Sequence, residues 1–182
     1  MHDDHHPHGP RRAAAAAVVA LLLLVPLMVL RAVTGQAWRA GEFVLLGAFL
    51  AAILLVREVA VRVPTRHARA AGLAIAVAAS LLQLWANLAV GIIGSEDHPA
   101  NLWFTGVVAL ALVGMALAGG CARAMAWAMR ATAAAQGAAF VAALALGLGF
   151  TGPVTLFFAA MWLAAASLFQ RAATVVGPAR RA

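Results

Sequence analysis

The sequence predicts an all-α fold, a polytopic membrane helix bundle of about six transmembrane helices. The 182-residue chain is 65% hydrophobic and only 10% charged, whereas soluble domains carry about a quarter charged residues. Its mean hydropathy of +0.95 is correspondingly high. Apolar runs long enough to cross about 30 Å of hydrocarbon alternate with short segments rich in Arg, Gly and Pro.

The positive net charge of the chain is also explained by a membrane location. The formal net charge of +7 comes from thirteen basic residues, all of them Arg, and they flank the apolar runs as basic residues do at membrane boundaries. We therefore expect the lipid bilayer as partner and no nucleic acid. The single cysteine, Cys121, can form neither an intramolecular disulfide nor a CxxC pair. We expect it to be a small packing residue near a helix end.

The N-terminal residues 1–12 are polar, contain Pro and Gly, and are predicted to form a disordered cytoplasmic tail. Its His and Asp residues permit weak binding of zinc, copper or nickel. A flexible tail supplies no fixed ligands, so an inert solvated tail is the favoured interpretation. The transmembrane domain is expected over 13–170, and a basic cytoplasmic tail over 171–182.

Six apolar stretches supply the predicted spans. The first, 13–30, is either an uncleaved signal anchor or a signal peptide cut near Ala37. The second runs over 43–63, and in it Glu58 and Arg62 are four residues apart and can pair on one helix face. A basic loop follows after Pro64 and Thr65. The remaining spans are expected at 70–93, 101–122, 132–148 and 154–169, with an interfacial extension at 123–130 and a Gly- and Pro-rich break at 147–153.

The placement of arginine predicts the orientation of these spans. With a cytoplasmic N-terminus, only Arg31 and Arg39 fall on the outer side, which favours six spans with both termini in the cytoplasm. The heavy use of Ala and the absence of Lys and Tyr suggest a GC-rich bacterial genome, so we expect a bacterial inner-membrane protein. The turn at 94–101 then faces the periplasm. Trp85 and Trp162 fall near mid-membrane, where we expect them to supply packing bulk. The arginines expected inside are Arg11, Arg12, Arg57, Arg62, Arg66, Arg69, Arg123, Arg130, Arg171, Arg180 and Arg181.

The third span carries a stripe of small and amide side chains along one helix face. Residues at spacings of three and four share a face, which predicts that this polar stripe points into the bundle rather than toward lipid. Such a face either packs helices together through cross-helix hydrogen bonds or lines a narrow pathway, and the absence of a deep ionisable residue favours packing. Candidate partners are Thr132, Gln136, Thr155 and Ser167. The stripe consists of Ser80, Gln83, Asn87, Gly91 and Gly94.

The periplasmic turn that follows also has two interpretations. Gly94 is suited to end the third helix in a left-handed conformation, Asp97 or His98 to cap the fourth, and Pro99 to occupy its first turn. Alternatively, neighbouring acidic and imidazole groups bind a divalent cation, although three adjacent residues rarely converge on one ion. We expect no metal, cofactor or catalytic residue, because the sequence holds no HExxH, GxSxG or Walker motif. The turn consists of Ser95, Glu96, Asp97, His98 and Asn101.

The segment from Asn87 to Leu102, with its core GIIGSED-x-PAN, resembles that of a family of small uncharacterised bacterial inner-membrane proteins. The resemblance covers the second half of the chain and implies a membrane location without a known activity. The leading hypothesis is a non-enzymatic membrane protein with a structural, accessory or stress-related role. It would self-associate through glycines such as Gly114, Gly119 and Gly120, or bind a membrane-protein partner. The alternative is a small-solute or ion permease that uses the polar stripe.

Overall fold

The computed structural model describes Met28 and residues 40–176, and in that part of the chain the fold is entirely helical. The expected tail at 1–12, the first span at 13–30 and residues 177–182 lie outside the described residues. The elements are, in order, α2 (Ala40–Arg62), η1 (Thr65–His67), α3 (Ala68–Ala89), α4 (Asn101–Leu117), α5 (Ala122–Ala145) and α6 (Gly152–Val176). The predicted all-α class is confirmed for these residues.

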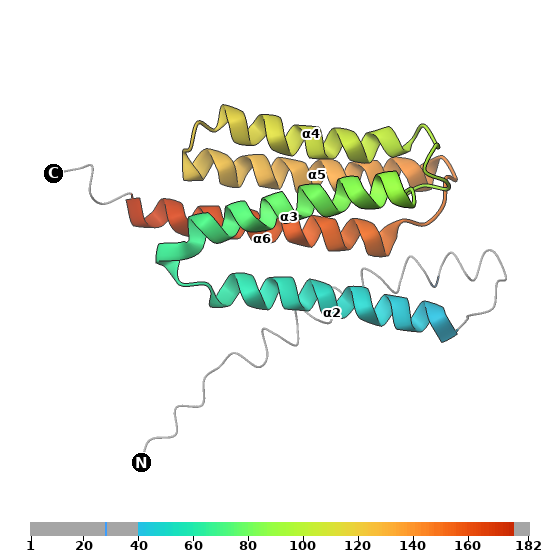
Figure 1. Cartoon of the computed structure of the whole chain (residues 1–182), viewed down its shortest axis with the longest axis horizontal. Coiled ribbons are helices and arrows are strands. Elements are labelled where there is room, and N and C mark those ends of the chain that lie inside the picture. The colour runs from blue at the N-terminus through green and yellow to red at the C-terminus, as the bar shows by residue number, and fades with distance from the viewer. Residues whose placement is uncertain (1–27, 29–39, 177–182) are drawn as a thin grey trace, which may run out of the picture.

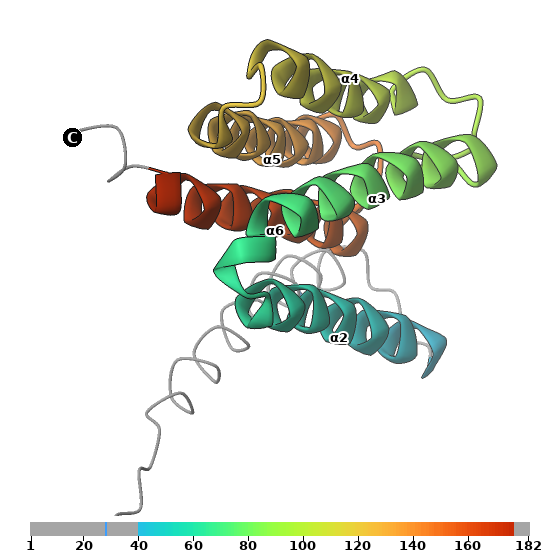
Figure 2. The same ribbon diagram turned by 60° about the vertical axis from the view of Figure 1, so that its left-hand side comes forward.

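Helices α3 to α6 form a bundle in which consecutive helices run in opposite directions (Figure 1). Helix α6 packs against α3 and α5, and α4 closes the bundle by packing against α5 and α3. Helix α2 lies outside this group of four and packs on α6 (Figure 2). The antiparallel order follows from the short connections, since neighbouring helices joined by short loops pack side by side.

The bundle core combines a few large side chains with many small ones. Trp162 and Phe169 of α6 and Met129 of α5 are fully buried. Small residues allow the helices to approach closely: a Cβ placed on Gly72 would lie 3.1 Å from the Phe169 ring, and one on Gly114 would lie 2.8 Å from the Ala128 Cβ. Gly114 therefore serves contact between α4 and α5 within the chain.

Three of the described helical segments are long and apolar enough to cross a membrane, namely Thr65–Ala89, Ala122–Ala145 and Gly152–Thr174. Helix α4 is apolar but has only 17 residues. The predicted number of six spans is therefore not supported, although the helical bundle is compatible with a membrane protein.

Two predicted boundaries are wrong because arginine residues lie within continuous helices. Residues 123–130 form the start of α5 rather than a separate interfacial segment, since Met125 and Met129 of this stretch are buried in the bundle. Similarly, α6 continues to Val176, so Arg171 lies in a helix and not in a tail. The basic segment after Pro64 also differs from a loop, because it folds into η1 and the first turn of α3.

Helix α3 ends at Ala89, four residues before the predicted end at Ile93. Gly91 follows with φ +76°, and a Cβ at this position would lie 2.6 Å from the Ser95 backbone. Only glycine fits here, because an L side chain disfavours this conformation and the neighbouring backbone leaves no room. Gly94 adopts φ +63°, as expected, but it lies inside the loop and does not end the helix. The predicted break between the last two spans is confirmed at residues 146–151.

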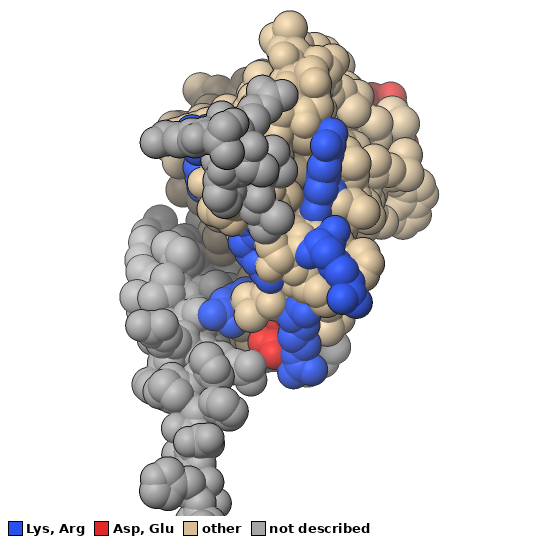
Figure 3. Space-filling model, turned by 90° about the vertical axis from the view of Figure 1, so that its left-hand side faces the viewer, with Lys and Arg blue, Asp and Glu red and all other residues tan. Residues whose placement is uncertain are grey.

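The two ends of the bundle differ in charge. One end, which we call the arginine end, holds the C-terminal turns of α2 and α6, η1 and the turn between α4 and α5 (Figure 1). Figure 3 shows this end face on, with Arg side chains spread over it. Its arginines include Arg62, Arg66, Arg69, Arg123 and Arg171. The opposite end, the loop end, carries the connection 90–100 with Glu96 and Asp97.

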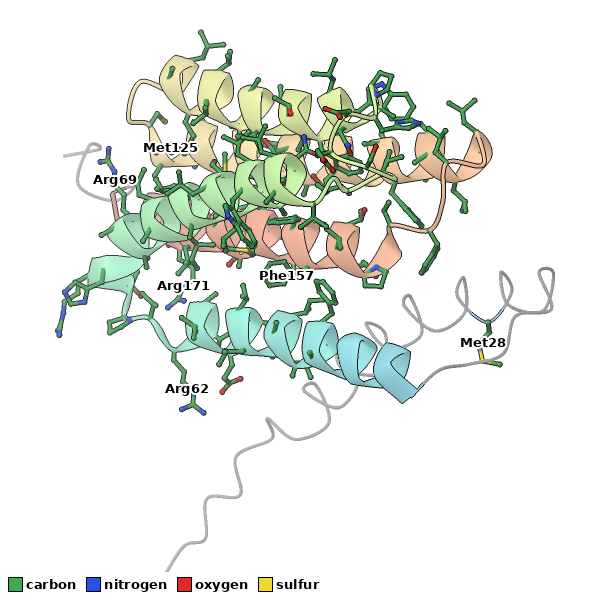
Figure 4. The ribbon with its side chains drawn as sticks, turned by 45° about the vertical axis from the view of Figure 1, so that its right-hand side comes forward. Met28, Arg62, Arg69, Met125, Phe157 and Arg171 are labelled. Atoms are coloured by element: carbon green, nitrogen blue, oxygen red, sulfur yellow. The ribbon has the colours of Figure 1, made fainter. Side chains whose placement is uncertain are left out.

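Helix α2 is fixed to the bundle by Arg171 of α6. The guanidinium donates from Nη1 to the Ala60 carbonyl at 2.8 Å and from Nη2 to the Val63 carbonyl at 2.7 Å. These carbonyls lie at the C-terminus of α2, where a cation stabilises the helix. Figure 4 shows Arg171 between the two helices and Phe157 further along, where its ring meets Phe49 of α2 edge to face.

The predicted ion pair within α2 is also present. The Arg62 Nε and the Glu58 Oε1 are 2.8 Å apart, and the Arg62 side chain is 73% exposed. An exposed pair of this kind contributes little stability.

Candidate functional site

The polar stripe on α3 faces the interior of the bundle. Ser80, Gln83 and Asn87 are 8%, 0% and 5% exposed. The large apolar side chains of the same helix point outward: Leu81, Trp85 and Leu88 are 63%, 65% and 75% exposed. The expected direction of these three polar side chains is confirmed. Trp85 does not fill the interior as expected, because it lies on the outer face.

The two glycines assigned to the stripe do not belong to it. Gly91 and Gly94 come after the last residue of α3, in the loop, and both have positive φ. The helical periodicity that put them on one face with Asn87 ends at Ala89.

Gln83 joins three helices. Its Nε2 donates to the Gln136 Oε1 of α5 at 2.8 Å and to the Phe104 carbonyl of α4 at 3.2 Å. Both glutamines are fully buried. Gln136 was among the partners expected from the sequence, whereas the backbone acceptor on α4 was not.

Asn87 lies one turn closer to the loop end and joins α3 to α4 alone. Its Nδ2 donates to the Asn101 carbonyl and to the Thr105 Oγ1, each at 2.9 Å. Ser80, on the other side of Gln83, bonds to the Ala76 carbonyl of its own helix at 2.9 Å. We refer to Gln83, Asn87, Thr105 and Gln136 as the amide ladder.

The other expected partners satisfy their hydroxyl groups locally. Thr132 and Ser167 donate to the Ala128 and Ala164 carbonyls of their own helices. The Thr155 hydroxyl lies 3.4 Å from that of Thr151. A hydroxyl group can bond to the carbonyl one turn earlier, so these residues need no partner on α3.

The amide ladder is not fully satisfied. The Gln83 Oε1, the Asn87 Oδ1 and the Gln136 Nε2 are buried and have no hydrogen-bond partner among the described residues. A buried polar group without a partner costs about 1–3 kcal/mol. The ladder therefore contains cross-helix hydrogen bonds together with buried donor and acceptor atoms that have no partner among the described residues. All of its side chains are neutral.

Asn101 organises the loop at the end of the ladder. Its Oδ1 accepts from the backbone N–H groups of Ile92 and Ile93 at 3.0 and 2.8 Å. Its Nδ2 donates to the Ser95 carbonyl at 2.7 Å, and its side chain is almost fully buried. One side chain thus satisfies the backbone N–H groups of Ile92 and Ile93 and adds to the bond that the Ser95 carbonyl accepts from the His98 N–H. This links the shape of the loop directly to the start of α4.

The remaining residues of the turn act at the start of α4 or lie in solvent. The His98 Nδ1 accepts from the Ala100 N–H at 3.2 Å, and the Asn101 N–H donates to the His98 carbonyl. The α-helix begins at Asn101, with Ala100 as its N-cap residue and no side-chain cap hydrogen bond. The expected capping by Asp97 or His98 is therefore wrong, and the His98 imidazole instead bonds within the turn that precedes α4. Ser95, Glu96 and Asp97 are exposed. Within the described residues, His, Cys, Asp and Glu form no group of three or more that could hold a metal ion.

Comparison of the chain with family models, curated proteins and solved structures finds no match.

Cys121 lies at the arginine end, exposed, immediately before α5. It lies near a helix end, as expected, but it is exposed and does not serve as a packing residue. Hydrogen bonds from the backbone N–H groups of Ala124 and then Arg123 lower the pKa of its thiol, because they stabilise the thiolate at the helix N-terminus.

Two cavities lie beside the ladder rather than on it. One, of about 310 Å³, is open to the surface and is lined by apolar side chains of α2, α3 and α6, among them Val56, Ile75 and Met161. The other, of about 300 Å³, lies between α3 and α4, with Met129 and Trp162 at its floor, and we call it the α3–α4 crevice. Neither is lined by Gln83 or Asn87.

Proposed function

We propose that the chain is an integral inner-membrane protein with a non-catalytic structural or accessory role, in which the amide ladder holds the bundle together. The observation that carries this proposal is the bond between Gln83 and Gln136. It joins two fully buried amides on α3 and α5 at 2.8 Å, and the same Gln83 nitrogen also bonds to α4. In hydrocarbon, such side-chain bonds between helices favour one specific packing over alternatives.

The charge difference between the two ends supports an orientation. Cytoplasmic segments of membrane proteins carry an excess of Lys and Arg, so the proposal places the arginine end in the cytoplasm and the loop end in the periplasm. Helix α2 and the apolar stretch at 13–30 would supply further spans, and both termini would be cytoplasmic.

A small-solute permease is the second candidate. It is favoured by the unpaired atoms on Gln83, Asn87 and Gln136, since buried amides with free capacity can bind a polar solute. It is disfavoured by the complete burial of Gln83 and Gln136 and by cavities that do not reach the ladder.

Flux and stability measurements on reconstituted protein distinguish the structural role from the permease. The structural role predicts that proteoliposomes are no more permeable to glycerol and urea than empty liposomes, and that Gln83→Leu and Asn87→Leu lower the stability of the bundle. Gln170→Leu removes a half-buried amide of α6 outside the ladder and is the matched control. Protein-dependent flux that Asn87→Leu abolishes while the bundle keeps its stability would establish the permease instead.

A further inference from the structure

One outward face of α5 carries two arginines with a tryptophan between them. Arg123, Trp127 and Arg130 recur at spacings of four and three, so they share one face of the helix. Arg123 is exposed and Trp127 is 63% exposed, whereas Met125 and Met129 on the opposite side are buried in the bundle. We call these three residues the α5 basic face. In a membrane this face borders lipid, because it is directed away from the bundle core.

Arg130 lies well inside the helix, but its charge is directed back toward the arginine end. The residue comes eight positions after Ala122, the first residue of α5, which is about 12 Å along the axis. Its guanidinium carbon lies 5.1 Å from the centre of the ring of Trp127, a residue three positions nearer that end. Long basic side chains beside lipid reach toward the headgroups in this way, and the cation–π contact holds the guanidinium there. Both arginines of the face therefore present their charge toward the same lipid–water boundary.

The bundle itself supplies no carboxylate for these charges. Helices α3, α4, α5 and α6 contain no Asp or Glu. Glu58 lies on α2 and pairs with Arg62, and Glu96 and Asp97 lie at the loop end. A cation that borders hydrocarbon is costly unless an anion pairs with it. Among the described residues no such anion adjoins α5, so another molecule has to provide it.

A third cation extends the positive charge across the adjoining turn. The Arg69 Nη2 of α3 lies 3.1 Å from the place that a Cβ on Gly120 would occupy, two residues before α5. Gly120 has φ +81°, and its missing side chain leaves room for the guanidinium. Figure 4 shows Arg69 at this end of the bundle, near Met125. The start of α5 is thus bordered by basic groups from two helices.

The position of the α5 basic face indicates which anion fits it. Beside an outward helix face at the membrane boundary, the abundant anions are the phosphates of phospholipids, and guanidinium groups bind phosphate oxygens strongly. The exposed ring of Trp127 is suited to pack on the glycerol and upper acyl chains, as interfacial tryptophans do. A zwitterionic lipid already pairs its phosphate with its own ammonium group. Uncompensated arginines therefore favour a lipid with a net negative charge.

From these observations we infer that the α5 basic face binds an anionic phospholipid, with Arg123 and Arg130 on the phosphate oxygens and Trp127 against the acyl chains. The inference rests on the membrane embedding proposed above. Lipid affinity in detergent depends neither on the orientation of the chain nor on the amide ladder, so it fails or succeeds separately from the proposed function.

The test is native mass spectrometry of the purified full-length protein in a neutral detergent, titrated with dioleoyl phosphatidylglycerol or with phosphatidylcholine of the same chains. We expect phosphatidylglycerol to bind at least about fivefold more tightly, since one basic residue near an anionic lipid already contributes that factor. Arg123→Gln and Arg130→Gln should each weaken phosphatidylglycerol binding about fivefold and leave phosphatidylcholine binding unchanged. Trp127→Leu releases the Arg130 guanidinium and should weaken it about two- to fivefold.

Arg66→Gln is the matched control. It removes an equal charge from the same end, on η1, which packs on α3 and α6, and it should leave the affinity for phosphatidylglycerol unchanged. Equal losses in Arg66→Gln and Arg130→Gln would overturn the inference, because the whole arginine end would then act as a diffuse positive surface. Equal affinities of the wild type for the two lipids would overturn it as well, and would reduce the face to ordinary lipid contact.

Glycerol phosphate carries the phosphate group without the acyl chains and should not displace the lipid at equal concentration. Displacement by this competitor would assign the face to a free phosphate compound and overturn the lipid assignment. Absence of saturable binding of either lipid would also overturn the inference, and would leave an acidic segment of a partner protein as the source of the counter-charge.

Discussion

Replacing Gln83 with Leu removes the donor that joins α3 to α5 and α4 while keeping a side chain of similar size. The Gln83 Nε2 makes two hydrogen bonds, at 2.8 and 3.2 Å. Each contributes about 1 kcal/mol in proteins generally, and cross-helix bonds in membranes average about 0.6 kcal/mol with a maximum of about 1.7. We therefore expect Gln83→Leu to lower the free energy of unfolding by about 1–3 kcal/mol.

The pairing itself is tested by a double-mutant cycle. In Gln83→Leu the Gln136 amide is left with no partner for either of its atoms, since its Nε2 already lacks one. Removing both amides relieves this second cost. The double variant should therefore lose less than the two single variants together, by about 0.6–1.7 kcal/mol.

The measurement is reversible unfolding of the purified protein from mild detergent into dodecyl sulfate, followed by circular dichroism. Gln170→Leu should change the free energy of unfolding by less than about 0.5 kcal/mol, as substitutions away from packed polar networks do. Losses from Gln83→Leu and Gln136→Leu that add within about 0.3 kcal/mol would refute the ladder as a source of bundle stability.

Four further outcomes follow from the geometry and from the proposed orientation. Gly91→Ala should destabilise the loop by more than the roughly 1–2 kcal/mol that a left-handed conformation costs an L residue, because the new Cβ would lie 2.6 Å from the Ser95 backbone. Gly94→Ala, whose Cβ would have its nearest neighbour at 3.7 Å, should cost only the conformational roughly 1–2 kcal/mol. Comparing the melting temperatures of the two variants tests this difference. Arg171→Gln should lower stability by about 1–3 kcal/mol and expose the end of α2 to protease, and Arg171→Lys should recover only part of the loss because an ammonium lacks the planar fork. The pKa of the Cys121 thiol is lowered, so its alkylation by iodoacetamide should reach half of the maximal rate at a lower pH than the alkylation of an exposed loop thiol. The comparison thiol is supplied by Ser95→Cys in a Cys121→Ser background. In right-side-out vesicles, a membrane-impermeant maleimide should label Ser95→Cys and leave Cys121 unmodified; the reverse result would contradict the proposed orientation.

Local patterns in the sequence were sufficient to predict the all-helical class and the inward face of α3, but not the number of spans or all of the helix boundaries. Ser80, Gln83 and Asn87 recur at spacings of three and four, and helical geometry alone places them on one face. The break before α6 follows equally from glycines at 147 and 149 and the proline at 153. These features depend on residues close together in the chain.

Features that depend on backbone acceptors and distant packing could not be predicted in this way. Arg123 and Arg130 suggested a membrane boundary, yet Met125 and Met129 between them pack into the core and extend α5. Gln83 bonds to the Phe104 carbonyl, a group that every residue carries and that no sequence pattern marks.

The hydrogen bonds between Arg171 and the end of α2 have a consequence for biogenesis. Ala60 and Arg171 are separated by 111 positions in the sequence. During translation at about 5–20 residues per second, the nascent α2 therefore waits roughly 5–20 seconds for the helix that holds it. Over that interval its apolar flank has to be shielded by the translocon, a chaperone or surrounding lipid. Slowing the ribosome between the codons for these two helices should therefore increase degradation of newly made chains.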